Sequence, residues 1–404
     1  MNKRLLIGTG AAIATALALL LGGVLAGDPA AEARPQSSPG ELARVGLGYL
    51  QRARETGDAN DYARAERPLE QAFARDPSNL YALHGLGSLA LSRHRFREAL
   101  ALGRRAQRLS PTTARTYGVI GDALIELGRY GEAFRAYDRM ALLKPSLSAY
   151  ARVSHARELL GDVSGAIAAM ELAVRAAGPQ PEPLAWSHVQ LGKLHFSRGR
   201  LAPAVREYRA ALAAFPGYVH ALDALARVEA ARGRLAQAVA LQRAAVERQP
   251  VPELVGFLGD LYRAQGRTRL AREQYGLVGA IERLLIASGF KTDLETALFD
   301  VDHGLRLEAA LARARRAQHE RPSIQADDVL SWALARTGRC GEALRFSKRA
   351  LRLGTRDAPT FFHRGMIERC FGRDAESRRW FRKALETNPY FSVAWAPLAR
   401  RLAA

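Results

Sequence analysis

The most regular feature of the chain is a spacing of large, small and turn-forming residues that recurs about every 34 positions. The clearest copy has Tyr117, Ile120, Gly121, Leu124, Gly128, Tyr130, Ala133, Tyr137 and Pro145 at positions 4, 7, 8, 11, 15, 17, 20, 24 and 32 of the unit. A second copy keeps this register with Leu191, Gly192, His195, Gly199, Leu201, Ala204, Tyr208, Ala211 and Pro216. Each copy predicts two helices joined by a turn.

The residue types at these positions have physical reasons. Glycine or alanine at positions 8 and 20 leaves room where two helices approach closely. A large residue at position 24, such as Tyr137 or Tyr208, fills the wedge between neighbouring units. Glycine at position 15 suits the left-handed residue that ends a first helix, and proline at position 32 stops the second helix.

Copies of the unit cover nearly the whole chain. They begin near Gly46, Leu80, Ala114, Leu147, Ala185, Val219, Pro252, Lys291, Ile324 and Ala358, with successive starts 33 to 39 residues apart. Longer connections precede the fifth and eighth copies, and the eighth lacks the Leu-Gly pair.

This pattern resembles the tetratricopeptide repeat, a helix-turn-helix unit of 34 residues. The resemblance implies an all-α, right-handed superhelical solenoid of about ten repeats over residues 46–390. The segment 391–404 is similar to the capping helix that covers the exposed apolar edge of such stacks. The first helix of each repeat is expected to line a concave groove.

The N-terminus predicts a location. Lys3 and Arg4 precede a charge-free apolar stretch over residues 5–26, which is typical of an export signal. These 22 residues are also enough to span a bilayer. We therefore expect residues 1–26 to be either a signal peptide or a transmembrane anchor, followed by a linker over residues 27–45. The rest of the chain would be extracytoplasmic, either secreted or anchored to the cytoplasmic membrane.

The large positive net charge gives little information about function. The formal net charge is +20, from 60 Lys plus Arg against 40 Asp plus Glu. The basic residues are almost all arginine and are spread over the whole chain rather than gathered in blocks. This distribution fits a general compositional bias better than a dedicated polyanion site.

The sequence does not predict catalysis. It contains no His-Glu-x-x-His, Gly-x-Ser-x-Gly or phosphate-loop motif, and its nine histidines are scattered. Asp300, Asp302 and His303 cluster, but the helical register points them to different faces, which favours a polar patch over a metal site. We expect a protein that is not an enzyme and needs no cofactor.

The resemblance also indicates which side chains face the groove, because positions 2, 5, 9 and 12 of each first helix point inward in this family. Aromatic and arginine side chains among them suit an extended peptide or a glycan, although any of these aromatics could instead pack between helices. The predicted partner-binding residues are Tyr81, His84, Arg115, Asp122, His155, Trp186, Lys193, Phe196, His220, Arg227, Arg263, Trp332, Phe362 and Arg369.

Two cysteines, Cys340 and Cys370, lie at positions 17 and 13 of the ninth and tenth copies. Both positions fall at one edge of the stack, so the two residues should lie near each other. Either they form a disulfide, which export would permit, or both are small buried core residues. A Cα separation within about 7 Å is required for the bridge.

These features favour an extracytoplasmic scaffold that binds protein or peptide partners along its groove. The alternative is a protein that binds an envelope glycan or an acidic polymer, and nucleic-acid binding is the weakest hypothesis. Membrane contact is expected through the N-terminal segment alone.

Overall fold

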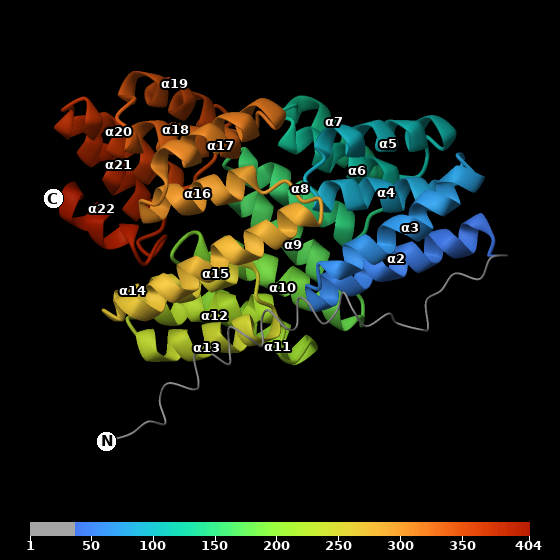
Figure 1. The fold of residues 1–404 in the computed structure, drawn as a ribbon, viewed down its shortest axis with the longest axis horizontal. Coiled ribbons are helices and arrows are strands. Elements are labelled where there is room, and N and C mark those ends of the chain that lie inside the picture. Colours follow the sequence, from blue (N-terminus) through green and yellow to red (C-terminus); the bar gives the residue numbers. More distant parts are fainter. Residues whose placement is uncertain (1–36) are drawn as a thin grey trace.

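The computed structural model describes residues 37–404, and the regular secondary structure of this part of the chain is entirely α-helical (Figure 1). The helices form ten helix-turn-helix pairs, here numbered repeats one to ten, followed by a single terminal helix. Their bounds are α2 (Pro39–Thr56), α3 (Asn60–Arg75), α4 (Leu80–Ser92), α5 (Phe96–Leu109), α6 (Ala114–Glu126), α7 (Tyr130–Leu143), α8 (Leu147–Leu159), α9 (Val163–Arg175), α10 (Pro181–Phe196), α11 (Leu201–Ala214), α12 (Val219–Ala231), α13 (Leu235–Arg248), α14 (Pro252–Ala264), α15 (Thr268–Ala287), α16 (Asp293–His303), α17 (Leu307–Glu320), α18 (Ile324–Arg336), α19 (Cys340–Ala350), α20 (Ala358–Cys370), α21 (Asp374–Thr387) and α22 (Trp395–Ala403). The predicted all-α class and paired arrangement are confirmed.

The repeat register is reproduced closely. Seven first helices begin at the predicted residue, namely Leu80, Ala114, Leu147, Val219, Pro252, Ile324 and Ala358. The glycine predicted to end a first helix has a left-handed φ of 67 to 78° at Gly128, Gly161, Gly199, Gly233, Gly266, Gly338 and Gly372. The local signals therefore set both the length and the phase of the repeat.

Three boundaries differ from the prediction. The first helix begins at Pro39 because Ser38 and Glu41 form a reciprocal capping box, so residues 39–45 are helical rather than part of the linker. The fifth repeat begins at Pro181, four residues early, because a proline is well tolerated in the first helical turn. The long connection before the eighth repeat is a helical extension: α15 has 20 residues and packs Val278 and Ile281 into the core.

The N-terminal apolar segment predicted to act in export lies outside the described residues. Within residues 37–404, no helix combines the length and the hydropathy needed to cross a membrane.

Helix pairs approach closely at one recurring contact. A Cβ added to Gly121, Gly192, Gly259 or Gly365 would lie 2.3 to 2.6 Å from an aromatic ring of the second helix. The rings belong to Tyr137, Tyr208, Tyr275 and Phe381, respectively. Glycine at position 8 is thus needed because the ring at position 24 occupies the space of a side chain.

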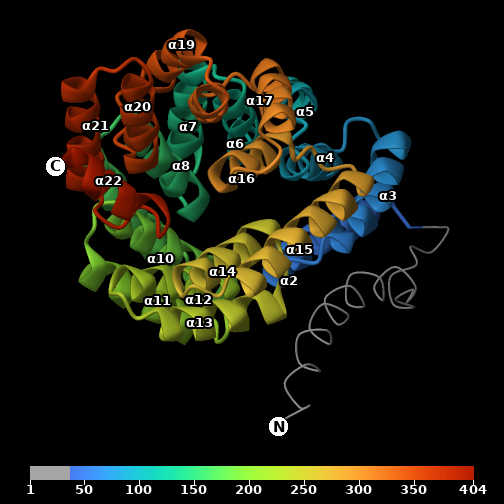
Figure 2. The same cartoon turned by 60° about the vertical axis from the view of Figure 1, so that its left-hand side comes forward.

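The stack coils until its later repeats contact its earlier ones (Figure 2). The turn inside each of several repeats meets the end of the repeat five units further on. Lys291 N donates a hydrogen bond to Arg93 O over 3.2 Å, and Ile324 N donates one to Tyr130 Oη over 2.7 Å. Thr355 Oγ1 donates to Leu159 O, 196 residues apart in sequence. We call this line of contacts the seam.

The end of the chain folds over the inner face of the last repeats. Residues 391–394 form a turn and α22 begins at Trp395, four residues later than the predicted capping segment. The Trp395 ring lies 5.9 Å from that of Trp332 and 5.5 Å from that of Phe362. The terminal helix therefore covers aromatic rings that would otherwise face the concave side.

Cys340 and Cys370 form a disulfide with a Cα separation of 6.0 Å. Neither residue belongs to the buried core, so the alternative of two core cysteines is wrong. The bridge joins α19 to the end of α20 and ties repeats nine and ten together.

Candidate functional site

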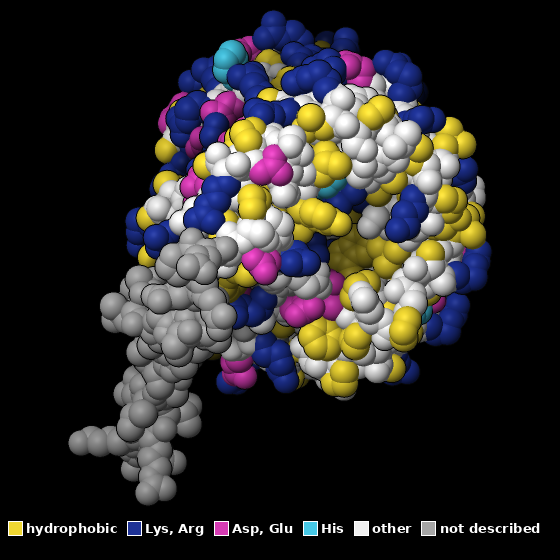
Figure 3. Space-filling model, turned by 90° about the vertical axis from the view of Figure 1, so that its right-hand side faces the viewer, with side chains coloured by type: hydrophobic (Ala, Val, Ile, Leu, Met, Phe, Trp, Pro, Cys, Tyr) yellow, Lys and Arg dark blue, Asp and Glu magenta, His cyan; other side chains and the backbone are white. Residues whose placement is uncertain are grey.

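Three overlapping cavities lie inside the coil, with volumes of about 610, 460 and 250 Å³. Arg227 and Phe257, from the first helices of repeats six and seven, line all three. We call this continuous space the central channel. Figure 3 shows a hollow with an apolar floor and with both cationic and anionic side chains at its rim.

The apolar part of the channel comes from several repeats. Phe257, Leu298, Phe299 and Val329 project from α14, α16 and α18. Phe391, from the turn before α22, lines two of the three cavities. Such a lining offers apolar contact along a path rather than one deep pocket.

The wall formed by repeats seven to ten is rich in carboxylates that already have partners. Asp260 accepts a hydrogen bond from Tyr275 Oη at 2.8 Å and lies 2.7 Å from His303 Nε2. Asp302 accepts from Trp332 Nε1 at 2.9 Å, and Asp328 lies 3.0 Å from His363 Nδ1. This wall is therefore acidic and rigidly held.

Burial in this wall shifts the pKa values of its carboxyl and imidazole groups. Burial raises the pKa of Asp302, although the nearby His363 opposes the shift. It also raises the pKa of Asp357 and of Glu253. For His303, burial lowers the pKa, but the hydrogen bond and the charge of Asp260 outweigh burial and the net pKa is raised.

Arg227 stands at the centre of the channel. Its guanidinium makes two hydrogen bonds to Asp223, at 2.9 and 3.1 Å, and lies 4.1 Å above the ring of Phe257. These contacts fix a planar cation at the point where the three cavities meet.

A second concave site lies on the first helices of repeats one to four. This cavity of about 430 Å³ is lined by Arg54, Arg115, Lys144 and Arg152, together with serine and aliphatic side chains. One carboxylate, Asp122, also lines it and is held by Arg152 through hydrogen bonds of 2.8 and 2.6 Å. We call this site the basic pocket.

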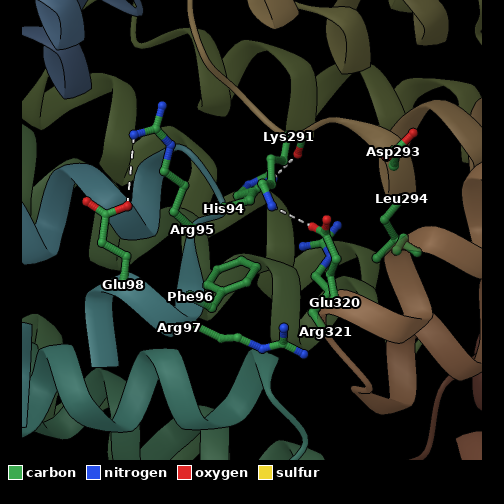
Figure 4. Close-up of a pocket in the computed structure, with 11 residues that line it drawn as sticks. His94, Arg95, Phe96, Arg97, Glu98, Lys291, Asp293, Leu294, Glu320 and Arg321 are labelled. Atoms are coloured by element: carbon green, nitrogen blue, oxygen red, sulfur yellow. Dashed lines mark hydrogen bonds and ion pairs between the residues drawn. The ribbon is translucent and has the colours of Figure 1, made fainter. Parts of the chain in front are cut away.

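A smaller cavity of about 270 Å³ lies at the seam, between the start of α5 and the turn before α16 (Figure 4). Two of its cations are paired with carboxylates: Lys291 Nζ lies 2.8 Å from Glu320, and Arg321 contacts Glu126 and Glu295. His94 has a left-handed φ of 58° and contacts Lys291 O at 2.8 Å. These contacts hold the two turns of the coil together.

Several predicted groove residues do line these spaces. Arg115 and Asp122 line the basic pocket, while Phe196 and Arg227 line the central channel. Lys193 and His220, on α10 and α12, line none of these cavities; burial, and then the charge of Lys193, lower the pKa of His220.

Other predicted residues line none of these cavities. Tyr81 is 60% exposed on α4, and the His155 side chain lies 3.8 Å from Glu158. Arg263 and Arg369 are exposed. Trp186 is partly buried and packs between the cores of neighbouring repeats.

Three groove predictions are wrong because the side chains are buried. His84 is 4% exposed and its Nε2 lies 2.7 Å from Thr116 Oγ1. Trp332 is 1% exposed, with its ring stacked 4.7 Å from that of His363. Phe362 has no exposed surface and only backs the channel wall. The terminal helix covers both aromatic residues, which the pattern of a single repeat does not reveal.

The predicted set also misses residues that shape the site. Phe257 and Arg152 stand at position 6 of their repeats, next to the inward position 5. Gln325 stands at inward position 2 and lines two of the cavities, but as a lone neutral side chain it gives no signal. Phe391 lies outside the repeats, so no repeat position predicts its place.

The side chains of Asp300, Asp302 and His303 have separate partners, as their register predicts. Asp300 pairs with Arg306 and Arg313, Asp302 with Trp332, and His303 with Asp260. Within residues 37–404, no group of three His, Cys, Asp or Glu side chains is placed to hold a metal ion.

The paired helices and the concave inner face define an all-α repeat scaffold. Family models of the tetratricopeptide repeat match residues 50–114 and 189–252, and a second such model matches residues 114–146. The matched segments are tetratricopeptide repeats. Proteins built from these repeats typically bind proteins or peptides and are typically not catalysts.

No curated protein matches the sequence. Among solved structures, a human IFIT1 dimer with PPP-AAAA is 17% identical, with 79% of this chain and 73% of that chain covered, at a TM-score of 0.52. A thermophilic tetratricopeptide-repeat protein of Thermus thermophilus, TTC0263, is 22% identical over 48% of this chain and 99% of its own, with a TM-score of 0.42. YrrB, described as having an unusual peptide-binding site, is 18% identical over 46% and 94%, with a TM-score of 0.31. At these identities the likeness concerns the fold alone.

Proposed function

We propose that this protein is an extracytoplasmic scaffold that binds an extended polypeptide segment inside its central channel. One observation carries the proposal: three cavities join at Arg227 and Phe257 into a continuous path along the inner helices. A path suits an extended chain better than a compact small molecule, which a single enclosed pocket would hold.

The chemistry of the lining supports a polypeptide. Phe257 and Phe391 offer apolar contacts, and Gln325 offers an amide that can both donate and accept hydrogen bonds. Asp260 and Asp302 lie on the same wall, which disfavours a polyanion at this place because like charges repel. The predicted stacking of a glycan on Trp332 loses its basis, since that ring is buried.

Two observations support a location outside the cytoplasm. The apolar stretch over residues 5–26 follows two basic residues, as in export signals. The disulfide between Cys340 and Cys370 is of a kind that persists in oxidising compartments. Alkaline phosphatase fused after Ala404 should be active in growing cells, whereas a fusion active only in lysates would contradict this location.

The binding proposal is tested by obstructing the channel. Peptides that bind the full chain are first selected from a display library. Gln325→Trp places a bulky ring at an exposed position that lines two cavities. We expect this variant to bind the selected peptides at least about tenfold more weakly, because the ring and the peptide compete for one space.

The matched control is Arg139→Trp, which adds the same ring to an exposed position of α7 outside these cavities. It should bind like the unchanged protein. Equal affinities for both variants, or a loss only in the control, would show that the peptides bind elsewhere and would overturn the proposal.

A further inference from the structure

The geometry points to the basic pocket as a binding site for acidic side chains of the partner, so that the scaffold would select a segment with clustered Asp or Glu residues. This inference rests on the proposed function and adds the identity of one stretch of the ligand. It concerns repeats one to four, apart from the wall of carboxylates in repeats seven to ten.

The pocket brings cations together from separate elements. Arg54 comes from the last turn of α2, Arg115 from the first turn of α6, and Lys144 from the end of α7. Local sequence does not require these three charges to meet. The coil of the stack brings them together, since helices from four repeats border a single cavity of about 430 Å³.

Arg54, Arg115 and Lys144 lack carboxylate partners in the part of the chain that the structure describes. Arg54 donates to the neutral amide of Gln51 instead. Asp122, the pocket's carboxylate, is already neutralised by Arg152. Three cations without an ion pair of their own therefore border this cavity, whereas in the seam cavity Lys291 and Arg321 are paired with glutamates.

The cations of the pocket also act on one another. Burial, and then the charges of Arg54 and Arg152, lower the pKa of Arg115. An incoming carboxylate would relieve this repulsion and make charge-assisted hydrogen bonds with the guanidinium groups. An anionic ligand therefore offsets an unfavourable interaction that the fold itself creates.

The remaining lining favours a peptide over a nucleic acid. Leu91, Val119 and Met140 offer aliphatic surface, which suits the methylene groups of glutamate side chains. No aromatic ring lines this pocket, whereas single-stranded nucleic acids are held largely by stacking of their bases on such rings.

The test uses the full chain and three fluorescent probes: hexaglutamate, hexaglutamine and hexa-adenylate RNA. We expect hexaglutamate to bind, hexaglutamine not to bind, and the RNA to bind more weakly than hexaglutamate. Arg115→Gln and Lys144→Gln should each weaken hexaglutamate binding by about tenfold, since each removes one charged contact. The control Arg139→Gln, an exposed arginine outside the pocket, should leave binding unchanged.

A second variant separates binding from folding. Asp122→Asn frees Arg152 for the ligand and should tighten hexaglutamate binding by about threefold, which damage to the fold would not do. Circular dichroism and thermal melts confirm that each variant is folded.

The inference is overturned if hexaglutamate does not bind, if Arg115→Gln behaves like Arg139→Gln, or if RNA binds more tightly and depends on the same residues. If hexaglutamate does not bind but Gln325→Trp still weakens binding of the peptides selected by display, the inference fails and the proposed function stands. Binding of hexaglutamate without any selected channel peptide would support the pocket and remove the proposed function.

Discussion

At the scale of single residues, the repeat depends on glycines where aromatic rings take the place of a side chain. Gly192 shows this directly, because an added Cβ would lie 2.3 Å from a ring carbon of the buried Tyr208. The ring is wedged between two repeats and cannot withdraw without opening a cavity.

We predict that Gly192→Ala destabilises the fifth repeat by about 1 to 3 kcal/mol, because the methyl group overpacks the helix contact. Thermal melts and hydrogen exchange of α10 and α11 measure the effect. The matched control is Gly276→Ala in α15, where an added Cβ meets nothing within 4 Å and should be neutral or stabilising. Equal melting temperatures for both variants would contradict the packing argument.

His84 gives a prediction about acid stability. Burial, and then the charge of Arg115, lower its pKa from 6.5 to about 4. Above pH 6.5 the residue is neutral in both the folded and the unfolded states. As the pH falls from 6.5 to 4, the unfolded chain gains a proton that the folded chain does not, so the free energy of unfolding falls by about 2 kcal/mol.

His84→Gln should lack this component, so its melting temperature should fall less than that of the unchanged protein between pH 6.5 and 4. His155→Gln, which alters a histidine with an exposed side chain, should follow the unchanged protein. Parallel pH curves for all three proteins would show that folding does not lower the pKa of His84.

At the scale of helices, the end of the stack is secured by a covalent link. The disulfide spans 30 residues and joins the last two repeats. We predict that the double variant Cys340→Ser, Cys370→Ser lowers the stability of repeats nine and ten by about 2 to 4 kcal/mol, because a closed loop restricts the unfolded chain. Hydrogen exchange in α20 to α22 should accelerate while α4 to α8 remain unchanged. Unchanged exchange at the C-terminal end would contradict this role.

The seam gives a second prediction at this scale. Tyr130 Oη accepts the buried Ile324 N–H across two turns of the coil. Tyr130→Phe leaves that donor without a partner at a cost of about 1 to 3 kcal/mol. Exchange of the first turn of α18 should become faster, although α18 lies 194 residues away in sequence.

The control for this prediction is Tyr117→Phe, which removes a hydroxyl that donates to Pro111 O, only six residues away in sequence. It should leave exchange in α18 unchanged. An equal effect of both variants on α18 would mean that Tyr130 acts through local packing and not through the seam.

At the scale of the whole molecule, the sequence predicts the structure of a single repeat better than the way in which the ten repeats coil against one another. Helix starts such as Leu80 and Ile324 follow from glycine, proline and apolar positions within one repeat, and these signals are local. Closure of the coil depends on a small rotation per repeat that accumulates over five repeats. No residue pattern states that rotation, so the contact of Tyr130 with Ile324 could not be predicted.

The candidate site follows the same division. Arg115 and Arg227 were predictable because they occupy inward positions of ordinary repeats. Trp332 was misplaced because α22 folds back over it, and Phe391 was missed because it lies in that returning turn. The errors therefore gather where the chain departs from the stacking of identical units.

Photo-crosslinking in intact cells shows whether partners bind inside the channel. A benzoylphenylalanine at position 325 faces the channel, and one at position 139 lies on the outer surface. We expect position 325 to capture discrete polypeptides, position 139 to capture none, and the selected channel peptides to compete with capture at position 325. Crosslinks that form only at position 139, or capture at position 325 that those peptides leave unchanged, would contradict binding inside the channel.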